Sequence, residues 1–330
     1  MKKRVSIVVL LLVIFFLSGC FYSGIDNVNN GSTSVIEETN YKVTFVVDGI
    51  EKGYKIVSNM QIFGPMEAPK KENYIFAGWF TEDGKEFLFD KPINESIYLY
   101  AKYTPNYSAL INKISTEIIK SNVEIRVKNY NTFLGFETES ITSSGSGIII
   151  ADAHGYYYIL TNSHVVYKRE GYSHIQYTVQ DYIGNTYSAS ILNNSIDPNY
   201  DLATLVFKKG STMLSAIQIA KKNPLIGEEI IALGQPKGQN NTITFGKVLN
   251  YRKVNFSEPI ASSTVNFPVA VHNAPIDCGS SGGAILNVGL NLVGINFAGS
   301  SSNNDFISAV AIPIEKVWEY LYKYVRTDGK

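Results

Sequence analysis

Hydrophobic residues along the 330-residue chain fall into four successive patterns. The first is a mostly apolar run near the N-terminus, over residues 5–17. Alternation typical of strands follows in residues 41–104, and apolar residues with helical spacing cover residues 106–120. From residue 123 onward many short apolar runs are separated by glycine, asparagine and serine. These patterns predict a small β domain followed by a larger all-β barrel or sandwich domain.

The first twenty residues have the features of an export signal. Three basic residues at positions 2–4 precede an apolar run of 13 residues, which is shorter than the ~20 needed to span a bilayer. This combination predicts a secretory signal peptide. The run ends in LSGC, which resembles the lipobox of bacterial lipoproteins and implies that Cys20 is lipidated, unless the cysteine stands there by chance. The mostly polar residues 21–40 predict a flexible tether. We therefore expect an extracytoplasmic protein, lipid-anchored to the bacterial cell membrane and exposed at the cell surface.

Residues 41–104 alternate in the manner of strands separated by polar turns. Val43, Phe45 and Val47 are expected on one face of the first strand, and Trp79 in a small core. The segments YKVTFVVDG, YIFAGWFTEDGKEFLFD and IYLYAKYTP resemble, in the expected order, the internalin B-repeat, also called the Listeria–Bacteroides repeat. That resemblance implies a β-grasp-like module, a spacer or an adhesion module with a surface ligand, rather than an enzyme.

Two helices are expected in the larger domain, residues 105–330. The first follows Pro105 with Asn106 or Ser108 as its cap, and its apolar positions are Leu110, Ile111, Ile114 and Ile118. The second starts at Pro313 and closes the chain with one apolar face, formed by Val317, Trp318, Leu321, Tyr322 and Val325.

Composition narrows the classes of function. Lysine plus arginine equals aspartate plus glutamate, at 29 each, so no net charge points to nucleic acid or to an acidic surface. The 22 tyrosines and 17 phenylalanines favour strands. Two cysteines are too few for a disulfide framework. No cluster has metal-ligand spacing and no glycine loop has phosphate-binding spacing, so we expect neither a metal nor a cofactor.

Three short segments of the larger domain carry residue types that act together in nucleophilic catalysis. ILTNSHVV presents His164 after an apolar strand, and DPNYDLATLV places Asp201 at the head of another. DCGSSGGAIL holds Ser281 in a glycine-rich loop. A serine hydroxyl needs a neighbouring base, which histidine provides, and a buried carboxylate orients that histidine. Each segment alone is weak evidence, but their order along the chain indicates a Ser-His-Asp triad.

The glycines around Ser281 allow main-chain N–H groups to turn inward. Such donors form an oxyanion hole, and one donor contributes roughly 3–4 kcal/mol of transition-state stabilisation. We expect the N–H groups of Gly279 and Ser281 to be the pair, with that of Ser280 turned into the same loop.

The three motifs TNSHVV, DLATLVF and GSSGGA resemble those of trypsin-like, chymotrypsin-clan serine proteases. SSGSGIII, ALGQPKG, NAPIDCGSSGGAILN, NLVGINFAG and SAVAIPI extend the resemblance to the HtrA/DegP-type branch, over most of residues 121–326. It implies two six-stranded antiparallel β-barrels with the active-site cleft between them. We expect this chain to lack the PDZ domain of that branch.

The resemblance also implies where a substrate side chain would bind. Its pocket would be bounded near Ile276 and by the strand that contains Asn296 and Phe297. Pro275 stands six positions before Ser281, where an acidic residue would favour lysine or arginine. We therefore expect a small or medium apolar residue before the scissile bond. Ser280 replaces the aspartate with which trypsin binds a newly cut N-terminus, so activation of that kind is not expected.

Three further residues have alternative interpretations. Asp197 competes with Asp201 for the triad, but it precedes a proline and suits a turn. His272 either lines the cleft or is structural, and the structural role is favoured. Cys278 is either a small loop residue or a semi-exposed thiol whose oxidation would distort the loop around Ser281.

The sequence therefore predicts a serine endopeptidase that cleaves protein or peptide substrates through an acyl-enzyme intermediate. The alternative is a surface adhesin that carries a catalytically inactive protease fold.

Overall fold

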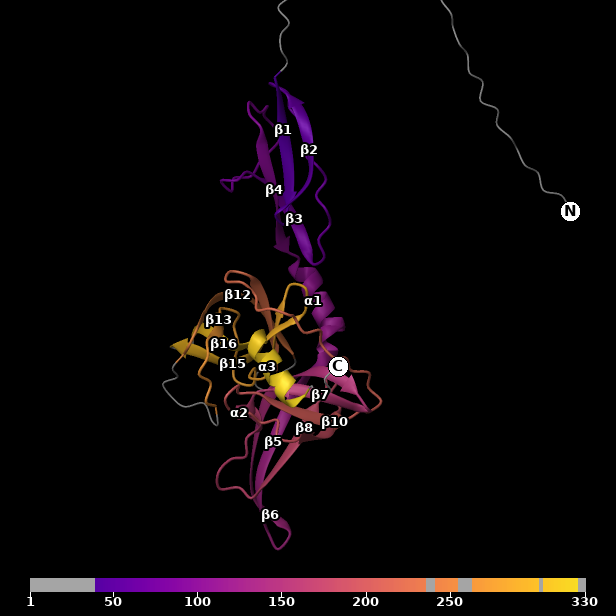
Figure 1. The fold of residues 1–330 in the computed structure, drawn as a ribbon. Coiled ribbons are helices and arrows are strands. Elements are labelled where there is room, and N and C mark those ends of the chain that lie inside the picture. The colour runs from indigo at the N-terminus through magenta and orange to yellow at the C-terminus, as the bar shows by residue number, and fades with distance from the viewer. Residues whose placement is uncertain (1–38, 236–240, 255–262, 303–304, 326–330) are drawn as a thin grey trace, which may run out of the picture.

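The computed structural model describes residues 39–235, 241–254, 263–302 and 305–325. A small sheet, a connecting helix and two β-barrels follow one another along the molecule (Figure 1). The predicted signal peptide, Cys20 and almost all of the tether lie outside the described residues. Among the helices that are described, none has the length and apolar character needed to cross a membrane. The helices are α1 (Tyr107–Thr116), the 3-10 helix η1 (Ile118–Ser121), α2 (Ser163–Val166) and α3 (Ile314–Tyr324).

The N-terminal sheet has the strand order β2-β1-β4-β3, with β1 antiparallel to β2 and parallel to β4. Its strands are β1 (Asn40–Val47), β2 (Ile50–Ser58), β3 (Tyr74–Phe80) and β4 (Ile97–Pro105). Val43, Phe45 and Val47 are buried, as the alternation predicted. The ring of Trp79 meets that of Phe45 edge-on at 4.8 Å, and its Nε1 donates to the carbonyl of Met66. Trp79 is therefore a core residue, as predicted.

The larger domain contains two closed six-stranded barrels, which confirms the predicted fold. The first has the order β10-β7-β6-β5-β8-β9 and the second β11-β12-β13-β16-β15-β14. The first barrel consists of β5 (Asn122–Phe133), β6 (Phe136–Ala153), β7 (Tyr156–Thr161), β8 (His174–Gln180), β9 (Thr186–Ile191) and β10 (Ala203–Lys208). The second consists of β11 (Glu229–Gly234), β12 (Thr242–Arg252), β13 (Val269–His272), β14 (Ala284–Asn287), β15 (Leu292–Ser302) and β16 (Asp305–Pro313).

One apolar cluster joins the two barrels, while each barrel also has a separate apolar cluster of its own. Neighbouring residues of a strand point to opposite faces, so Ile159 of β7 lies inside the first barrel while Leu160 packs with residues of the second. Ile148 belongs to the same shared cluster, together with Ile231 and Leu233. This contact fixes the ends of β7 and β10 relative to the loop that precedes β14.

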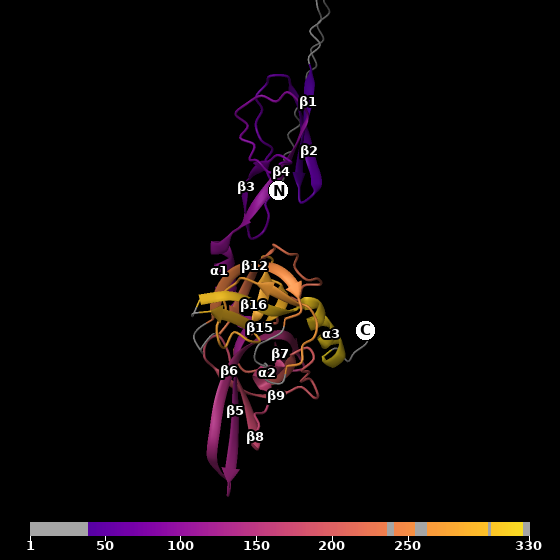
Figure 2. The same cartoon turned by 90° about the vertical axis from the view of Figure 1, so that its left-hand side faces the viewer.

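The β5–β6 hairpin projects from the first barrel, at the opposite end of the molecule from the N-terminal sheet (Figures 1 and 2). Its tip exposes three large apolar side chains, those of Phe133, Leu134 and Phe136.

Helix α1 connects the N-terminal sheet to the barrels. The side chain of Asn106 accepts a hydrogen bond from Ala109 N–H at 3.1 Å, which confirms the predicted cap. Leu110 and Ile114 are fully buried, whereas Ile111 is 44% exposed. Each residue advances a helix by about 100°, so Ile111 falls beside the buried face rather than on it.

The closing helix α3 begins after Pro313, as predicted, but its buried face differs in one position. Val317 and Leu321 are buried, whereas Tyr322 is 60% exposed and Tyr320 is fully buried. The prediction for Tyr322 was therefore wrong, because the buried face of α3 rotates toward Tyr320, whose hydroxyl has buried polar partners.

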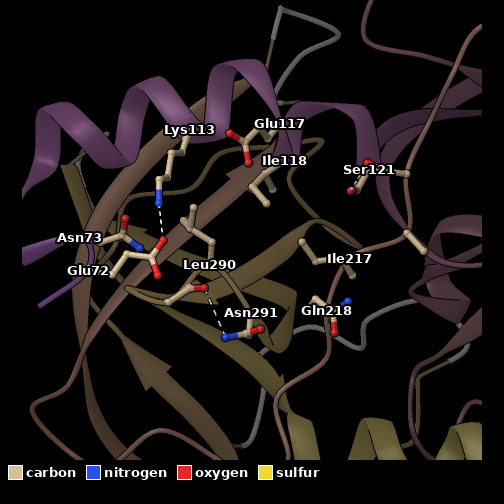
Figure 3. A pocket seen from close by; sticks show the side chains of 13 residues that line it. Glu72, Asn73, Lys113, Glu117, Ile118, Ser121, Ile217, Gln218, Leu290 and Asn291 are labelled. Atoms are coloured by element: carbon tan, nitrogen blue, oxygen red, sulfur yellow. Dashed lines mark hydrogen bonds and ion pairs between the residues drawn. The ribbon is translucent and has the colours of Figure 1, made fainter. Parts of the chain in front are cut away.

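The N-terminal sheet docks on the second barrel beside α1. Asn73 Nδ2 donates to the carbonyl of Val288 at 2.8 Å, and Lys113 Nζ lies 2.5 Å from Glu72 Oε1. Figure 3 shows the Lys113–Glu72 pair beside a pocket of about 320 Å³ between the sheet, α1 and the second barrel. No residue of the predicted triad or oxyanion loop lines this pocket.

Candidate active site

His164 and Asp201 come from neighbouring strand ends of the first barrel. His164 lies in the single-turn helix α2, directly after β7. Asp201 lies in the turn before β10, with a left-handed φ of 50°. Strands β7 and β10 pair antiparallel, with Thr161 opposite Ala203, so the end of one strand meets the start of the other. The two predicted residues therefore meet at one edge of the barrel.

The carboxylate of Asp201 is fully buried and accepts hydrogen bonds on both oxygens. Its Oδ2 lies 2.7 Å from His164 Nδ1. Its Oδ1 accepts from Ser163 Oγ at 2.8 Å and from the backbone N–H of His164 at 3.1 Å. Asn162 Nδ2 also donates to the carbonyl of Asp201, at 3.0 Å. Because Nδ1 faces an acceptor, the proton of a neutral imidazole belongs on Nδ1, and Nε2 is left as the base.

Ser281 lies in the loop before β14 of the second barrel. Gly282 N–H donates to Asn296 O at 3.0 Å, and Asn296 N–H donates to Gly283 O at 2.8 Å. These bonds attach the loop to β15. Ser281 Oγ donates to the carbonyl of Phe297 at 3.4 Å. Within the described residues no hydrogen bond joins Ser281 to His164. In structures without substrate, the distance between a catalytic serine and its histidine is often long, and it shortens when substrate binds.

The loop leaves two main-chain donors free. Gly279 has a φ of 94°, which favours glycine. Among the described residues, the N–H groups of Gly279 and Ser281 have no hydrogen-bond acceptor. The N–H of Ser280 donates to Asp277 O at 3.0 Å, so it closes the loop and does not point into the cleft as an oxyanion donor. The structure therefore leaves Gly279 and Ser281, and not Ser280, as candidate oxyanion donors.

The predicted pocket residues differ in accessibility. Ile276 is partly exposed, and its Cγ1 would lie 3.2 Å from a Cβ placed on Gly299 of β15. Ile276 thus packs against Gly299, which leaves it room because glycine has no side chain. Asn296 and Phe297 are 0% and 1% exposed. The structure thus places these two residues behind the cleft surface, with the Phe297 ring centroid 6.1 Å from that of His164.

Two serines near the candidate triad were missed by the sequence analysis. Ser163 donates to Asp201 Oδ1, and the only sequence signal was its position beside His164. Ser146 lies in the SSGSGIII segment of β6 and hydrogen-bonds the loop of Ser281 from the other barrel. Nothing in the local sequence shows that contact.

Asp197 has partners in α3 rather than at His164. Lys323 Nζ lies 3.0 Å from its Oδ2, and Tyr324 Oη donates to the same oxygen at 2.7 Å. Burial alone would raise the pKa of Asp197, but the hydrogen bonds from Tyr324 and Lys323 outweigh it and hold the pKa below its usual value. Its contacts make Asp197 an attachment point for α3.

The remaining candidates are a buried histidine and an exposed cysteine. His272 is 1% exposed, in β13. Cys278 is exposed, and its N–H donates to Asp277 Oδ1 at 2.7 Å. In the part of the chain that the structure describes, no group of three His, Cys, Asp or Glu residues is arranged to hold a metal ion.

Each of the two folded parts of the chain is similar to a known protein family. Residues 145–295 match the family model of the trypsin-like peptidase domain, and residues 41–102 match that of the Listeria-Bacteroides repeat domain. The mitochondrial serine protease HTRA2 of Drosophila erecta is 32% identical over 203 residues, which are 61% of this chain and 44% of that protein. The chain thus spans less than half the length of this curated relative. These matches confirm the predicted HtrA-type resemblance and the predicted repeat domain.

The chain is also similar to two solved protease structures. The active form of the Rv3671c protease from M. tuberculosis is 20% identical with a TM-score of 0.49, over 67% of this chain and 88% of that one. The serine endoprotease from Yersinia pestis is 28% identical with a TM-score of 0.45, over 63% of this chain and 64% of that one.

Proposed function

We propose that this chain is a serine endopeptidase that cleaves proteins or peptides at Ser281. The observation that carries the proposal is the 2.7 Å contact between His164 Nδ1 and a fully buried Asp201, next to a loop with two free N–H groups. A buried carboxylate that orients a histidine has its chemical use in proton transfer to and from a nucleophile.

The proposed reaction starts when Ser281 Oγ leaves the carbonyl of Phe297 and gives its proton to His164 Nε2. The oxygen attacks the substrate carbonyl, and the N–H groups of Gly279 and Ser281 stabilise the resulting oxyanion. The protonated His164 then donates its proton to the leaving amine as the C–N bond breaks, which leaves an acyl-enzyme. Water hydrolyses that ester by the same steps, with His164 again as base.

The proposed preference is for a small or medium apolar residue before the scissile bond. Ile276 is apolar and partly exposed at the predicted pocket wall. Pro275 offers no charge to a lysine or arginine side chain. Among peptide substrates that differ only in this residue, those with valine or alanine should compete with an active-site probe more strongly than the one with lysine. A stronger competition by lysine would overturn this assignment.

A fluorophosphonate probe tests the activity. Such a probe phosphonylates an activated serine and releases fluoride. Purified residues 21–330 should be labelled, and the Ser281→Ala variant should not. Wild-type protein should also degrade an unfolded protein such as casein, whereas the variant should leave it intact. A well-folded wild type that is neither labelled nor active would refute the endopeptidase proposal.

A well-folded wild type that is neither labelled nor active would favour a second function, that of a surface binding protein with an inactive protease fold. The observation that supports it is the hydroxyl of Ser281, which points to Phe297 rather than to His164. In that case residues 41–104 would carry the activity, and binding of a surface ligand by this segment alone would support it.

We further propose that the enzyme is exported and anchored to the membrane through a lipid on Cys20. The proposal rests on the basic start, the short apolar run and the LSGC motif. Two or more acyl chains make a lasting anchor, because each buried CH₂ contributes about 0.8 kcal/mol. Probe labelling of fractionated cells should find the enzyme with the membranes, and the Cys20→Ser variant away from them. Equal distribution of the two would contradict a lipid anchor.

A further inference from the structure

The side chain of Ser146 connects the first barrel to the loop of Ser281. Ser146 is fully buried in β6. Its Oγ donates to the carbonyl of Gly279 at 2.7 Å and accepts from the backbone N–H of Gln235 at 2.8 Å. A hydroxyl has one proton. Because the Gln235 N–H can only donate, that proton points to Gly279.

Ser146 holds the loop at two places. Its backbone N–H donates to the carbonyl of Ser281 at 2.8 Å, while its hydroxyl holds the carbonyl of Gly279. The carbonyl between them, that of Ser280, accepts from Gly283 N–H at 3.0 Å. Three successive carbonyls are therefore hydrogen-bonded, and within the described loop 277–283 only the N–H groups of Gly279 and Ser281 are left without an acceptor.

The peptide plane between Gly279 and Ser280 is fixed from both sides. Ser146 Oγ holds its carbonyl, and Asp277 O accepts from its N–H. A peptide unit is planar, so these two bonds set the plane's orientation. The two free N–H groups belong to the peptide units on either side of it, and their directions depend on this plane.

We propose that Ser146 is a positioning residue, which keeps the N–H groups of Gly279 and Ser281 directed at the oxygen of the reacting carbonyl. This inference rests on the proposed function. Ser146 acts through the loop and does not touch the substrate itself.

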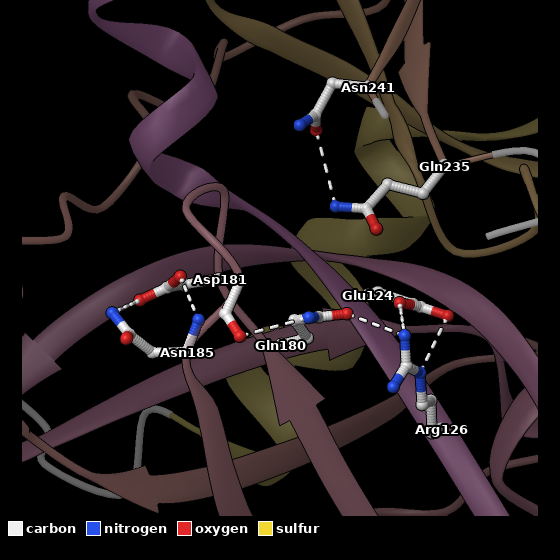
Figure 4. A network of polar contacts seen from close by, with 8 residues as sticks. Glu124, Arg126, Gln180, Asp181, Asn185, Gln235 and Asn241 are labelled. Carbon is white, nitrogen blue, oxygen red and sulfur yellow. Dashed lines mark hydrogen bonds and ion pairs between the residues drawn. The ribbon is translucent and has the colours of Figure 1, made fainter. Parts of the chain in front are cut away.

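The surroundings of Ser146 leave no room for another arrangement. A Cβ on Gly234 would lie 3.2 Å from Ser146 Oγ and equally close to Ser280 Cα, and a Cβ on Gly282 would lie 2.2 Å from Ser146 O. Gln235, which orients the hydroxyl, is held in turn: its Nε2 donates to Asn241 Oδ1 at 3.4 Å (Figure 4). The close packing requires glycine at positions 234 and 282, and the two hydrogen bonds of the Ser146 side chain require a hydroxyl.

The Ser146→Ala variant tests the proposal. Loss of one hydrogen bond of ordinary net strength, about 1 kcal/mol, corresponds to roughly a fivefold change in rate. We expect fluorophosphonate labelling and kcat to fall roughly fivefold, with KM unchanged, because the donors act mainly on the transition state. The pH profile of labelling should keep its shape, since His164 and Asp201 are untouched. The matched control is Ser144→Ala, at an exposed position of the same strand, which should label at the wild-type rate.

The outcomes separate this inference from the proposed function. The positioning role is overturned if a folded Ser146→Ala variant labels at the wild-type rate, or if only its KM rises while kcat is unchanged. The proposed peptidase activity stands in either case. If the wild-type protein is not labelled, the proposed function is overturned, and this inference is overturned with it. If Ser146→Ala does not fold, Ser146→Cys decides, because a thiol is a weak donor. A slowed Ser146→Cys variant supports the role, and a rate equal to wild type overturns it.

Discussion

At the scale of single residues, His272 shows how burial changes an ionisation. It lies fully inside the second barrel, and burial lowers its pKa to about 4, against a smaller opposing effect of the Ala274 backbone. An unfolded histidine titrates near 6.5. Below pH 6.5 the unfolded chain therefore binds a proton that the folded chain does not bind until about pH 4. This contribution to stability is complete above pH 6.5 and is lost as the pH falls toward 4.

We predict that His272 lowers the free energy of unfolding by about 2 kcal/mol between pH 7.5 and pH 5. Urea unfolding at the two pH values measures the difference, and His272→Leu should remove this part of it. The control is His154→Asn, at an exposed position with a φ of 52° that asparagine tolerates. An unchanged pH dependence in His272→Leu would show that the histidine is accessible to protons in the folded state.

The sequence predicted His164, Asp201 and Ser281 as a group, because each stands in a local motif, and the structure brings His164 and Asp201 into contact. It also separated Asp201 from Asp197, since a proline follows only the latter. The positions of Ser163 and Ser146 in the site depend instead on partners 38 and 133 residues away. Contacts of that range depend on how the barrels pack, which no local pattern of residue types records.

At the scale of elements, α3 shows why amphipathic spacing predicts a buried face only approximately. The pattern correctly placed Val317 and Leu321 inside, but Tyr320 and Tyr322 are both large and aromatic. The hydroxyl of Tyr320 has buried polar partners. Tyr320 Oη donates to Ser195 O at 2.6 Å and lies 2.9 Å from Thr204 Oγ1 in the first barrel. Such partners make burial of a polar group favourable.

We predict that Tyr320→Phe destabilises the protein by about 1–3 kcal/mol, because it leaves the buried carbonyl of Ser195 without this donor. Urea unfolding measures the loss. The same substitution at the exposed Tyr322 is the control, and it should change stability by less than about 0.5 kcal/mol. Equal effects of the two substitutions would mean that the Tyr320 hydroxyl does not attach α3 to the first barrel.

At the scale of the whole molecule, the repeat domain, α1 and the barrels form one row (Figure 2). The sequence predicted each part, because each has its own hydrophobic pattern. It did not predict how the first part docks, since the Asn73–Val288 contact joins residues 215 positions apart. The docked arrangement sets the direction in which the repeat domain extends from the second barrel.

We predict that Asn73→Gly loosens this docking without disturbing either part. Asn73 has a φ of 63°, which glycine adopts freely, so the substitution removes the bond to Val288 and leaves the turn intact. A net hydrogen bond of about 1 kcal/mol corresponds to roughly a fivefold shift toward the undocked state. Limited proteolysis between the sheet and α1 should accelerate by about that factor.

Asn194→Gly is the matched control for the docking prediction. Asn194 has a similar φ of 55° in the first barrel, so the same loss of side chain occurs away from the docked surface. It should leave the cleavage rate unchanged, and both variants should keep wild-type labelling of Ser281. If Asn73→Gly is cleaved no faster than Asn194→Gly, the exposed Lys113–Glu72 pair and α1 itself hold the repeat domain in place, and the bond to Val288 adds nothing.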